Sequence, residues 1–160
     1  MSVRVQKEDF DVSTELQLLR GGKYDIGGVC SFVGLVREMV STEGVGNAIS
    51  AMTLEHYPGM TERALKKIEA EAWERWPLAA SLIIHRYGKL RPGDQIVLVA
   101  AASAHRKVAF DACHYLIDWL KTKAPFWKFE DTADGGYWVE ARNSDNISAA
   151  GWNDSDVKKL

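Results

Sequence analysis

The chain has 160 residues, of which 46% are hydrophobic and 26% are charged, as is usual for a globular domain that buries its own core. Its 20 basic and 22 acidic residues give a net charge of −2, which argues against a module that binds nucleic acid through overall positive charge. Any anion-binding site must therefore be assembled locally, from basic residues that the fold brings together.

The first half of the chain predicts two strands and one helix. Residues 26–36, rich in valine and glycine, predict a strand, and the polar, glycine-containing residues 37–47 predict a loop. A second strand is expected over 48–57. Apolar residues then recur on one face over 60–76, which predicts a helix that Pro77 ends.

The second half adds two strands, a helix and a hairpin. Residues 80–87 and 95–102 predict strands joined by a tight turn at 91–94, which contains Pro and Gly. An amphipathic helix follows Ser103-Ala104-His105-Arg106 and is expected to end at Pro125.

The C-terminal part predicts a hairpin and then a tail. Strands over 125–130 and 137–142 are expected to flank Asp134-Gly135-Gly136. Residues after Asn143 are small and polar, which favours a loose tail.

Together these elements predict a single compact α+β domain with a mixed or antiparallel sheet and two main amphipathic helices. We expect the domain to cover residues 1–145 and a flexible C-terminal tail to cover 146–160.

The location of the protein is predicted from its cysteines and its N-terminal residues. Cys30 and Cys113 are isolated among apolar neighbours, which favours buried, reduced thiols over a disulfide framework or a metal site. No signal peptide is recognisable, and the longest apolar run, 96–102, is too short to span a bilayer. We therefore expect a cytoplasmic protein.

Ser103 to Arg106 mark the point where a buried strand ends and a helix begins. The start of a helix exposes unpaired N–H groups and the positive end of its dipole, so it binds anions readily. His105 and Arg106 would strengthen that preference. A serine cap followed by two solvated side chains explains the same residues, and is the commoner arrangement.

Two lysines near the end of the second helix are the other candidates. Lys121 lies in the last turn, where a lysine often only complements the helix dipole. Lys128 lies in an aromatic stretch, where loss of solvent would lower the pKa of its amine toward a catalytic range. A side chain that packs its stem on Trp127 and reaches solvent is an equally good interpretation.

The remaining polar residues carry weaker signals. Arg37 and Arg142 each follow a predicted strand, which is a common place for functional side chains. His56 and His85 have no ligand-type neighbour at metal-binding spacing, so we expect no metal site. The phosphate-binding and nucleophile motifs of P-loop enzymes, dinucleotide-binding domains and serine hydrolases are absent from the sequence.

Five segments, in this order, resemble the family of molybdopterin synthase catalytic (large) subunits. They are Met52–Met60, His85–Asp94, Ser103–Arg106, Lys121–Lys128 and Trp138–Arg142. The Lys-Thr-Lys-Ala-Pro-Phe-Trp-Lys segment is the most specific of them. The resemblance extends from about Gly27 to Arg142.

The resemblance implies an α/β-hammerhead-like fold and a homodimer within a heterotetramer, each catalytic subunit binding a small ubiquitin-like sulfur carrier. The carrier's C-terminal Gly-Gly thiocarboxylate would donate sulfur to cyclic pyranopterin monophosphate, making the dithiolene that later holds molybdenum. The protein itself would need no metal and no organic cofactor.

The site residues that the resemblance implies are Arg37, His105, Arg106, Lys121 and Lys128, with Arg142 reaching the site of the neighbouring subunit. We assign His105 and Arg106 to the phosphate and Arg37 to a second anion contact. Lys121 and Lys128 form the catalytic pair, one holding the thiocarboxylate and the other acting as general acid. The sequence leaves open which lysine takes which role.

Three rival functions remain open. An adaptor that only docks a ubiquitin-like tail gives His105 and Arg106 no role. A phosphoesterase with His105 as its base would release phosphate without any partner. A nucleic-acid module fits the negative net charge worst.

Overall fold

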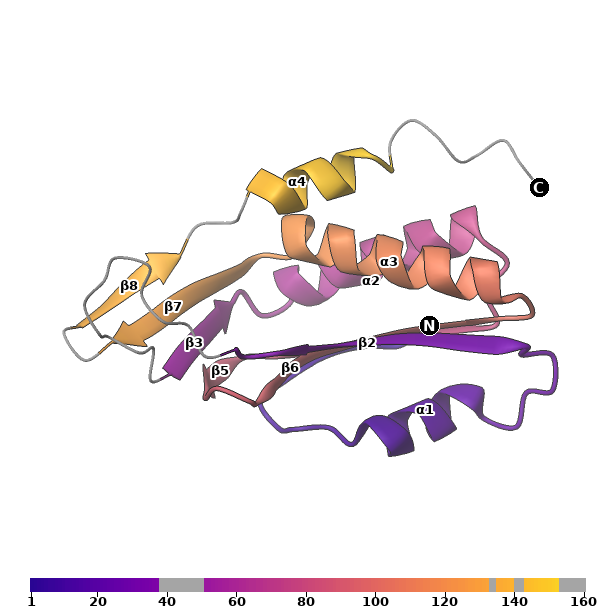
Figure 1. Ribbon diagram of the computed structural model, residues 1–160, viewed down its shortest axis with the longest axis horizontal. Helices are drawn as coiled ribbons and strands as arrows, with labels where there is room; N and C mark the ends of the chain where they lie inside the picture. Colours follow the sequence, from indigo (N-terminus) through magenta and orange to yellow (C-terminus); the bar gives the residue numbers. More distant parts are fainter. Residues whose placement is uncertain (38–50, 133–134, 140–142, 153–160) are drawn as a thin grey trace.

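Two four-stranded sheets and four helices make up the part of the chain that the structure, a computed structural model, describes, namely residues 1–37, 51–132, 135–139 and 143–152 (Figure 1). In chain order the elements are β1 (Val3–Gln6), α1 (Val12–Arg20), β2 (Gly28–Leu35), β3 (Ala51–His56), α2 (Met60–Arg75), β4 (Ala80–Arg86), β5 (Gly88–Leu90), β6 (Gln95–Ser103), α3 (Arg106–Lys123), β7 (Phe126–Thr132), β8 (Gly135–Val139) and α4 (Asn143–Ala150).

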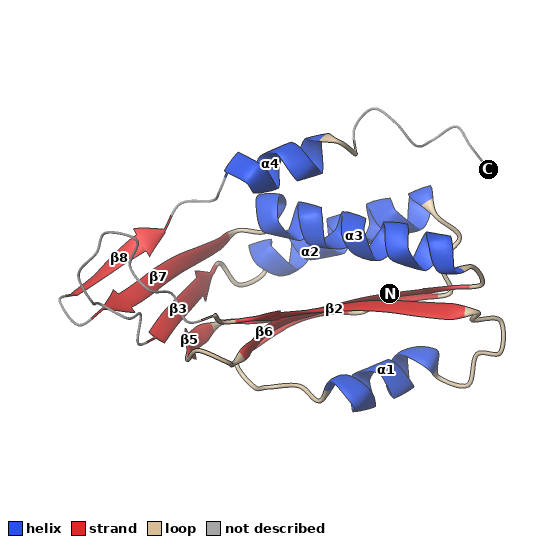
Figure 2. Ribbon diagram, viewed as in Figure 1, coloured by secondary structure: helices blue, strands red, loops and turns tan. Residues whose placement is uncertain are grey.

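The first sheet has the order β1-β4-β6-β2, with β1 parallel to β4 and the other pairs antiparallel. Helices α2 and α3 cover one face and α1 lies on the other (Figure 2). Burial on both faces explains why β6 reads as a nearly continuous apolar run.

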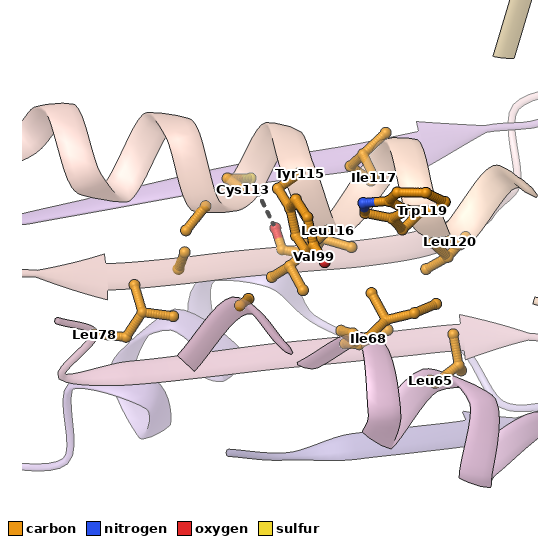
Figure 3. Packing of buried hydrophobic residues seen from close by; sticks show 14 of the residues in the cluster. Leu65, Ile68, Leu78, Val99, Cys113, Tyr115, Leu116, Ile117, Trp119 and Leu120 are labelled. Carbon is orange, nitrogen blue, oxygen red and sulfur yellow. Dashed lines mark hydrogen bonds between the residues drawn. The ribbon is translucent and has the colours of Figure 1, made fainter. Parts of the chain in front are cut away.

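The main core lies between this sheet and helices α2 and α3. Figure 3 shows Tyr115, Leu116 and Trp119 of α3 packed toward Leu65 and Ile68 of α2. A smaller cluster, centred on Leu82, Ile84 and Leu98, lies under α1. These contacts fix α3 along its length, so the positions of its two ends are set by the core.

The second sheet is antiparallel, has the order β5-β3-β7-β8, and extends beyond the end of α3 (Figure 1). β7 begins three residues after the last residue of α3 and lies between β3 and β8. The C-terminal end of α3 is therefore joined directly to an interior strand.

The predicted α+β class is confirmed, with two sheets where one was expected. The predicted helix over 60–76 and the strands over 80–87 and 95–102 agree with the structure to within one residue at each end. The turn at 91–94 is present, with Gly93 at φ 91°. The hairpin is also present, although β8 ends at Val139 and residues 140–142 lie outside the described part.

The prediction of a loose segment after Asn143 is wrong for residues 143–152. They form α4 and a turn, in which Ala149 is buried and Trp152 packs on the main core. Residues 153–160 lie outside the described part of the chain. Two apolar side chains in an otherwise polar segment were enough to dock it. Because the segment has no strong helical periodicity, the sequence analysis missed it.

Cys30 and Cys113, distant in sequence, come together where β2 packs against α3. Both are free thiols; Cys113 is buried and Cys30 is half-buried. Cys113 lies 3.9 Å from the Val99 carbonyl, a contact drawn in Figure 3. Burial, and after it the neighbouring Cys30, raises the pKa of Cys113 far above that of an ordinary thiol, so Cys113 is an inert core residue.

None of the helices in the described ranges is long and apolar enough to cross a membrane.

Candidate functional site

Arg37, Lys121 and Lys128 all lie toward the end of α3 from which the second sheet extends. β2 and α3 run in the same direction (Figure 1), and Arg37 follows β2 by two residues. The residue before it, Val36, is buried against the β3 residues Met52 and Leu54. This places Arg37 beside the second sheet, on the same side of the molecule as the two lysines.

Lys121 and Lys128 flank the junction between α3 and β7. Lys121 is exposed in the last turn of α3. The ammonium of Lys123, in the same turn, lies 3.7 Å from the centre of the Trp119 ring. The two lysines look alike in the sequence but have different surroundings in the structure, because Lys123 makes a cation–π contact with Trp119.

Lys128 forms an ion pair with Glu130, two residues along the same strand. Alternate residues of a strand share a face, so both side chains leave β7 on one side. The Glu130 side chain is only 1% exposed, whereas that of Lys128 is 33% exposed. A buried carboxylate thus holds an ammonium group that still reaches the surface.

The aromatic surroundings expected for Lys128 lie mostly on the other face of β7. Trp127 points away from Lys128 and packs edge-on against Tyr57, with ring centres 4.7 Å apart. Both rings are exposed. The partner of the Lys128 ammonium is therefore Glu130, a residue that the sequence analysis did not identify. The i, i+2 spacing of a Lys and a Glu in a predicted strand was the available signal.

A buried histidine packs against the first residue of β7. The His85 ring stacks on Phe126 at 3.7 Å with an interplanar angle of 17°. Burial, with a smaller contribution from nearby His56, lowers the pKa of His85 to about 4, although the Arg86 carbonyl opposes this. His85 is therefore a neutral structural residue at neutral pH, as the absence of ligand spacing indicated.

His105 and Arg106 lie at the opposite end of α3. Both are exposed, and His105 is the N-cap residue but makes no side-chain capping bond. Ser103 is not a cap, because its buried hydroxyl donates to the Pro77 carbonyl. Lys121 follows Arg106 by fifteen residues, which corresponds to about 22 Å along a helix at 1.5 Å per residue.

One chain therefore carries two separate groups of cations. The group at the C-terminal end of α3 suits an anionic tail that reacts near an ammonium group. The group at the N-terminal end combines two basic side chains with free helix N–H groups, an arrangement that suits a phosphate. Arg142 lies outside the described residues. Across the described ranges, no three His, Cys, Asp or Glu side chains are placed to hold a metal ion.

Comparison with known proteins gives a consistent result. Residues 5–123 match the family described as MoaE protein. The molybdopterin synthase catalytic subunit of Pseudomonas aeruginosa is 53% identical over 152 residues, which cover 95% of this chain and 99% of that protein.

Solved structures agree. The molybdopterin biosynthesis MoaE protein of Burkholderia ambifaria superposes with a TM-score of 0.80 at 48% identity, covering 96% of this chain and 99% of that one. The molybdopterin synthase of Staphylococcus aureus gives 0.76 at 32% identity, covering 86% and 96%. The chain therefore belongs to the MoaE family, whose curated relatives are catalytic subunits of molybdopterin synthase.

Proposed function

We propose that the chain is the catalytic subunit that transfers sulfur from the thiocarboxylated Gly-Gly end of a small ubiquitin-like carrier to cyclic pyranopterin monophosphate. The observation that carries the proposal is the lysine pair at the α3–β7 junction, with Lys128 held by the buried Glu130, in a member of the MoaE family. We also infer that the protein acts in the cytoplasm.

The electrostatic argument concerns two anionic reactants. A thiocarboxylate and a cyclic phosphate repel each other unless fixed cations lie between and around them. Lys121 and Lys128 supply such cations on a chain whose net charge is −2. We assign one lysine to the thiocarboxylate, stabilising charge at its carbonyl. The thiocarboxylate sulfur forms a bond to a pterin carbon, and the other lysine donates a proton to the oxygen that leaves that carbon. Water then cleaves the resulting thioester, so the sulfur stays on the pterin and the carrier ends as a carboxylate.

The phosphate contacts are assigned to His105 and Arg106, which lie too far from the lysines of the same chain. A dimer removes this difficulty. In a dimer with twofold symmetry, two copies of an interface helix can run antiparallel. A residue near one end of the helix then lies beside the other end of the partner's helix. Two α3 helices paired antiparallel would place His105 and Arg106 of one copy near Lys121 and Lys128 of the other.

Exposed apolar side chains on β2 and α3 support such pairing. Phe32 and Leu35 of the edge strand β2 are 41% and 55% exposed, and Phe110 on the outer side of α3 is 60% exposed. Large apolar side chains gathered along one side of a domain favour an interface. We therefore propose that the active unit is a homodimer with two shared sites, each completed by one carrier.

Exposed aromatic side chains near the α3–β7 junction, on the face of β7 opposite to Lys128, support docking of the carrier. Tyr57 and Trp127 lie at the end of the second sheet nearest α3, and both are exposed. Aromatic anchors of this kind dominate the energetics of protein interfaces. We propose that the body of the carrier contacts this pair, while its tail reaches Lys128.

The direct test is to mix the purified protein with thiocarboxylated carrier and precursor and to identify the dithiolene product by mass spectrometry. Sulfur addition that requires both reactants supports the proposal. An adaptor would bind the carrier and leave the precursor unchanged. A phosphoesterase would release phosphate from simple esters without the carrier. Either of those results would exclude the proposed reaction.

A further inference from the structure

The last described residue, Trp152, lies in a socket of three rings from α2 and α3. Its ring centre is 5.8 Å from that of Trp76, 5.4 Å from that of His114 and 5.6 Å from that of Tyr115, and all three contacts are edge-on. Edge-to-face packing at these distances is the favoured geometry for aromatic pairs. Three aromatic rings therefore contact the Trp152 side chain and restrict its position.

Two hydrogen bonds fix the orientation of Trp152. Its indole N–H donates to Asp118 Oδ2 at 2.7 Å, and its carbonyl accepts from Arg75 Nη1 at 2.9 Å. Asp118 is a buried carboxylate that also pairs with His114 at 3.2 Å. Bonds to charged groups out of solvent are stronger than neutral surface bonds, so these contacts specify one docked position.

Helix α4 depends on this socket for its place on the molecule. It has eight residues, and so short a helix is marginal without tertiary contacts. Among those of its side chains that the structure describes, Ala149 is buried whereas Ile147 is 74% exposed. Trp152, two residues after the helix, also packs on the main core.

The same segment is tied to the lysine site through β8. Val139, the last residue of β8, pairs directly with Lys128 of β7. Asn143, the first residue of α4, follows four peptide steps later, a span of at most about 14 Å. The covalent connection between α4 and the strand that borders Lys128 is therefore short.

We propose that Trp152 is a positioning residue for the reaction: by anchoring α4 it keeps β8 paired with β7, and so fixes the backbone that carries Lys128. The part of this inference that concerns turnover rests on the proposed function. The part that concerns the order of β8 does not, because it follows from packing alone.

The test compares Trp152→Ala with a matched control, Trp73→Phe. Trp73 also donates its indole N–H within the fold, to Ser81 of β4 at 2.6 Å. The control therefore reports the general cost of losing one tryptophan hydrogen bond. Amide hydrogen exchange over 135–139 and 143–150 is measured in the free protein, and kcat and KM are measured with the carrier and precursor.

For Trp152→Ala we expect exchange in both segments to rise at least about tenfold, because local opening becomes easier. We expect kcat to fall about tenfold and KM for the carrier to change less than about twofold, because misplacement of a reacting group lowers the rate without removing binding contacts. Trp152→Phe, which keeps a ring in the socket, should recover part of both effects. Trp73→Phe should leave the exchange of these two segments unchanged.

Unchanged exchange over 135–139 in Trp152→Ala would overturn the proposal, and so would faster exchange with wild-type kcat. If the wild-type protein itself formed no dithiolene, the proposed function would fail, yet the exchange result would still decide whether Trp152 orders β8.

Discussion

The two ends of α3 are built differently. At the C-terminal end, residues of the same chain contact Lys128 and its strand. Glu130 forms an ion pair with Lys128, and the His85 ring stacks on Phe126 at the start of that strand. At the N-terminal end, His105 and Arg106 are exposed, and His105 makes no side-chain capping bond. The contacts of the lysine end therefore lie within one chain, whereas His105 and Arg106 are available to the second copy in the proposed dimer.

The largest expected effect concerns Lys121 and Lys128, the lysines proposed to be catalytic. Lys121→Ala and Lys128→Ala should each lower the rate of dithiolene formation about 100- to 1,000-fold, the usual consequence of removing a charge that acts in the transition state. The thermal midpoint should change little for Lys121→Ala, because Lys121 is exposed. Wild-type turnover by either folded variant would remove that residue from the mechanism.

Because His85 packs against β7 in its neutral form, the free energy of unfolding should depend on pH. The pKa of His85 is about 4 in the folded protein, lowered by burial, whereas an ordinary histidine has 6.5. Between these values the unfolded chain binds the proton and the folded chain does not, so stability is complete above pH 6.5 and decreases as the pH falls toward 4. The loss should approach about 3 kcal/mol at pH 4, at roughly 1.4 kcal/mol per unit.

Urea unfolding at several pH values between 4 and 7 measures this effect. A His85→Phe variant, which keeps a ring against Phe126, should show a flatter profile over that range, since it has no proton to bind at this position. An identical profile in the variant and the wild type would show that His85 does not supply the pH dependence.

A smaller effect is expected at the buried carboxylate. Glu130→Gln leaves the Lys128 ammonium without its counter-charge and should lower the free energy of unfolding by about 1–3 kcal/mol, less than for a fully buried pair because Lys128 is one-third exposed. Asp111→Asn is a suitable control, since Asp111 pairs with Lys107, whose side chain is 84% exposed. The control should cost less than about 1 kcal/mol by thermal or urea unfolding. Equal costs for the two variants would show that Glu130 gives Lys128 no special support.

Sequence patterns were informative where the burial of an element shows in the spacing of its own apolar residues. The apolar run of β6 and the periodicities of α2 and α3 predicted these three elements, whereas β1 and α1 were not predicted. They could not predict that the strands divide into two sheets, because that depends on which strands pair across long stretches of chain. The three-residue strand β5 and the docking of α4 by Trp152 also depend on tertiary contacts.

The candidate site shows the same limit. The resemblance identified Lys121 and Lys128, and the helix start indicated His105 and Arg106. Glu130 was missed because a single carboxylate in a strand has no distinctive pattern until its burial is known. The sequence led us to expect all these cations in one site, whereas the length of α3 separates them into two groups within one chain. How two copies pair was not predictable, because the pairing depends on the shape of the exposed surface.

The most direct test of the account is complementation between two inactive variants, Arg106→Ala and Lys121→Ala, mixed under conditions that exchange subunits. If each site combines Arg106 of one copy with Lys121 of the other, a mixed dimer contains one intact site. Random mixing then restores about one quarter of wild-type dithiolene formation, since half of the dimers are mixed and half of their sites are intact. If exchange is verified by mass and activity stays at the level of the separate variants, the cations do not converge across the dimer, and the proposed shared site is contradicted.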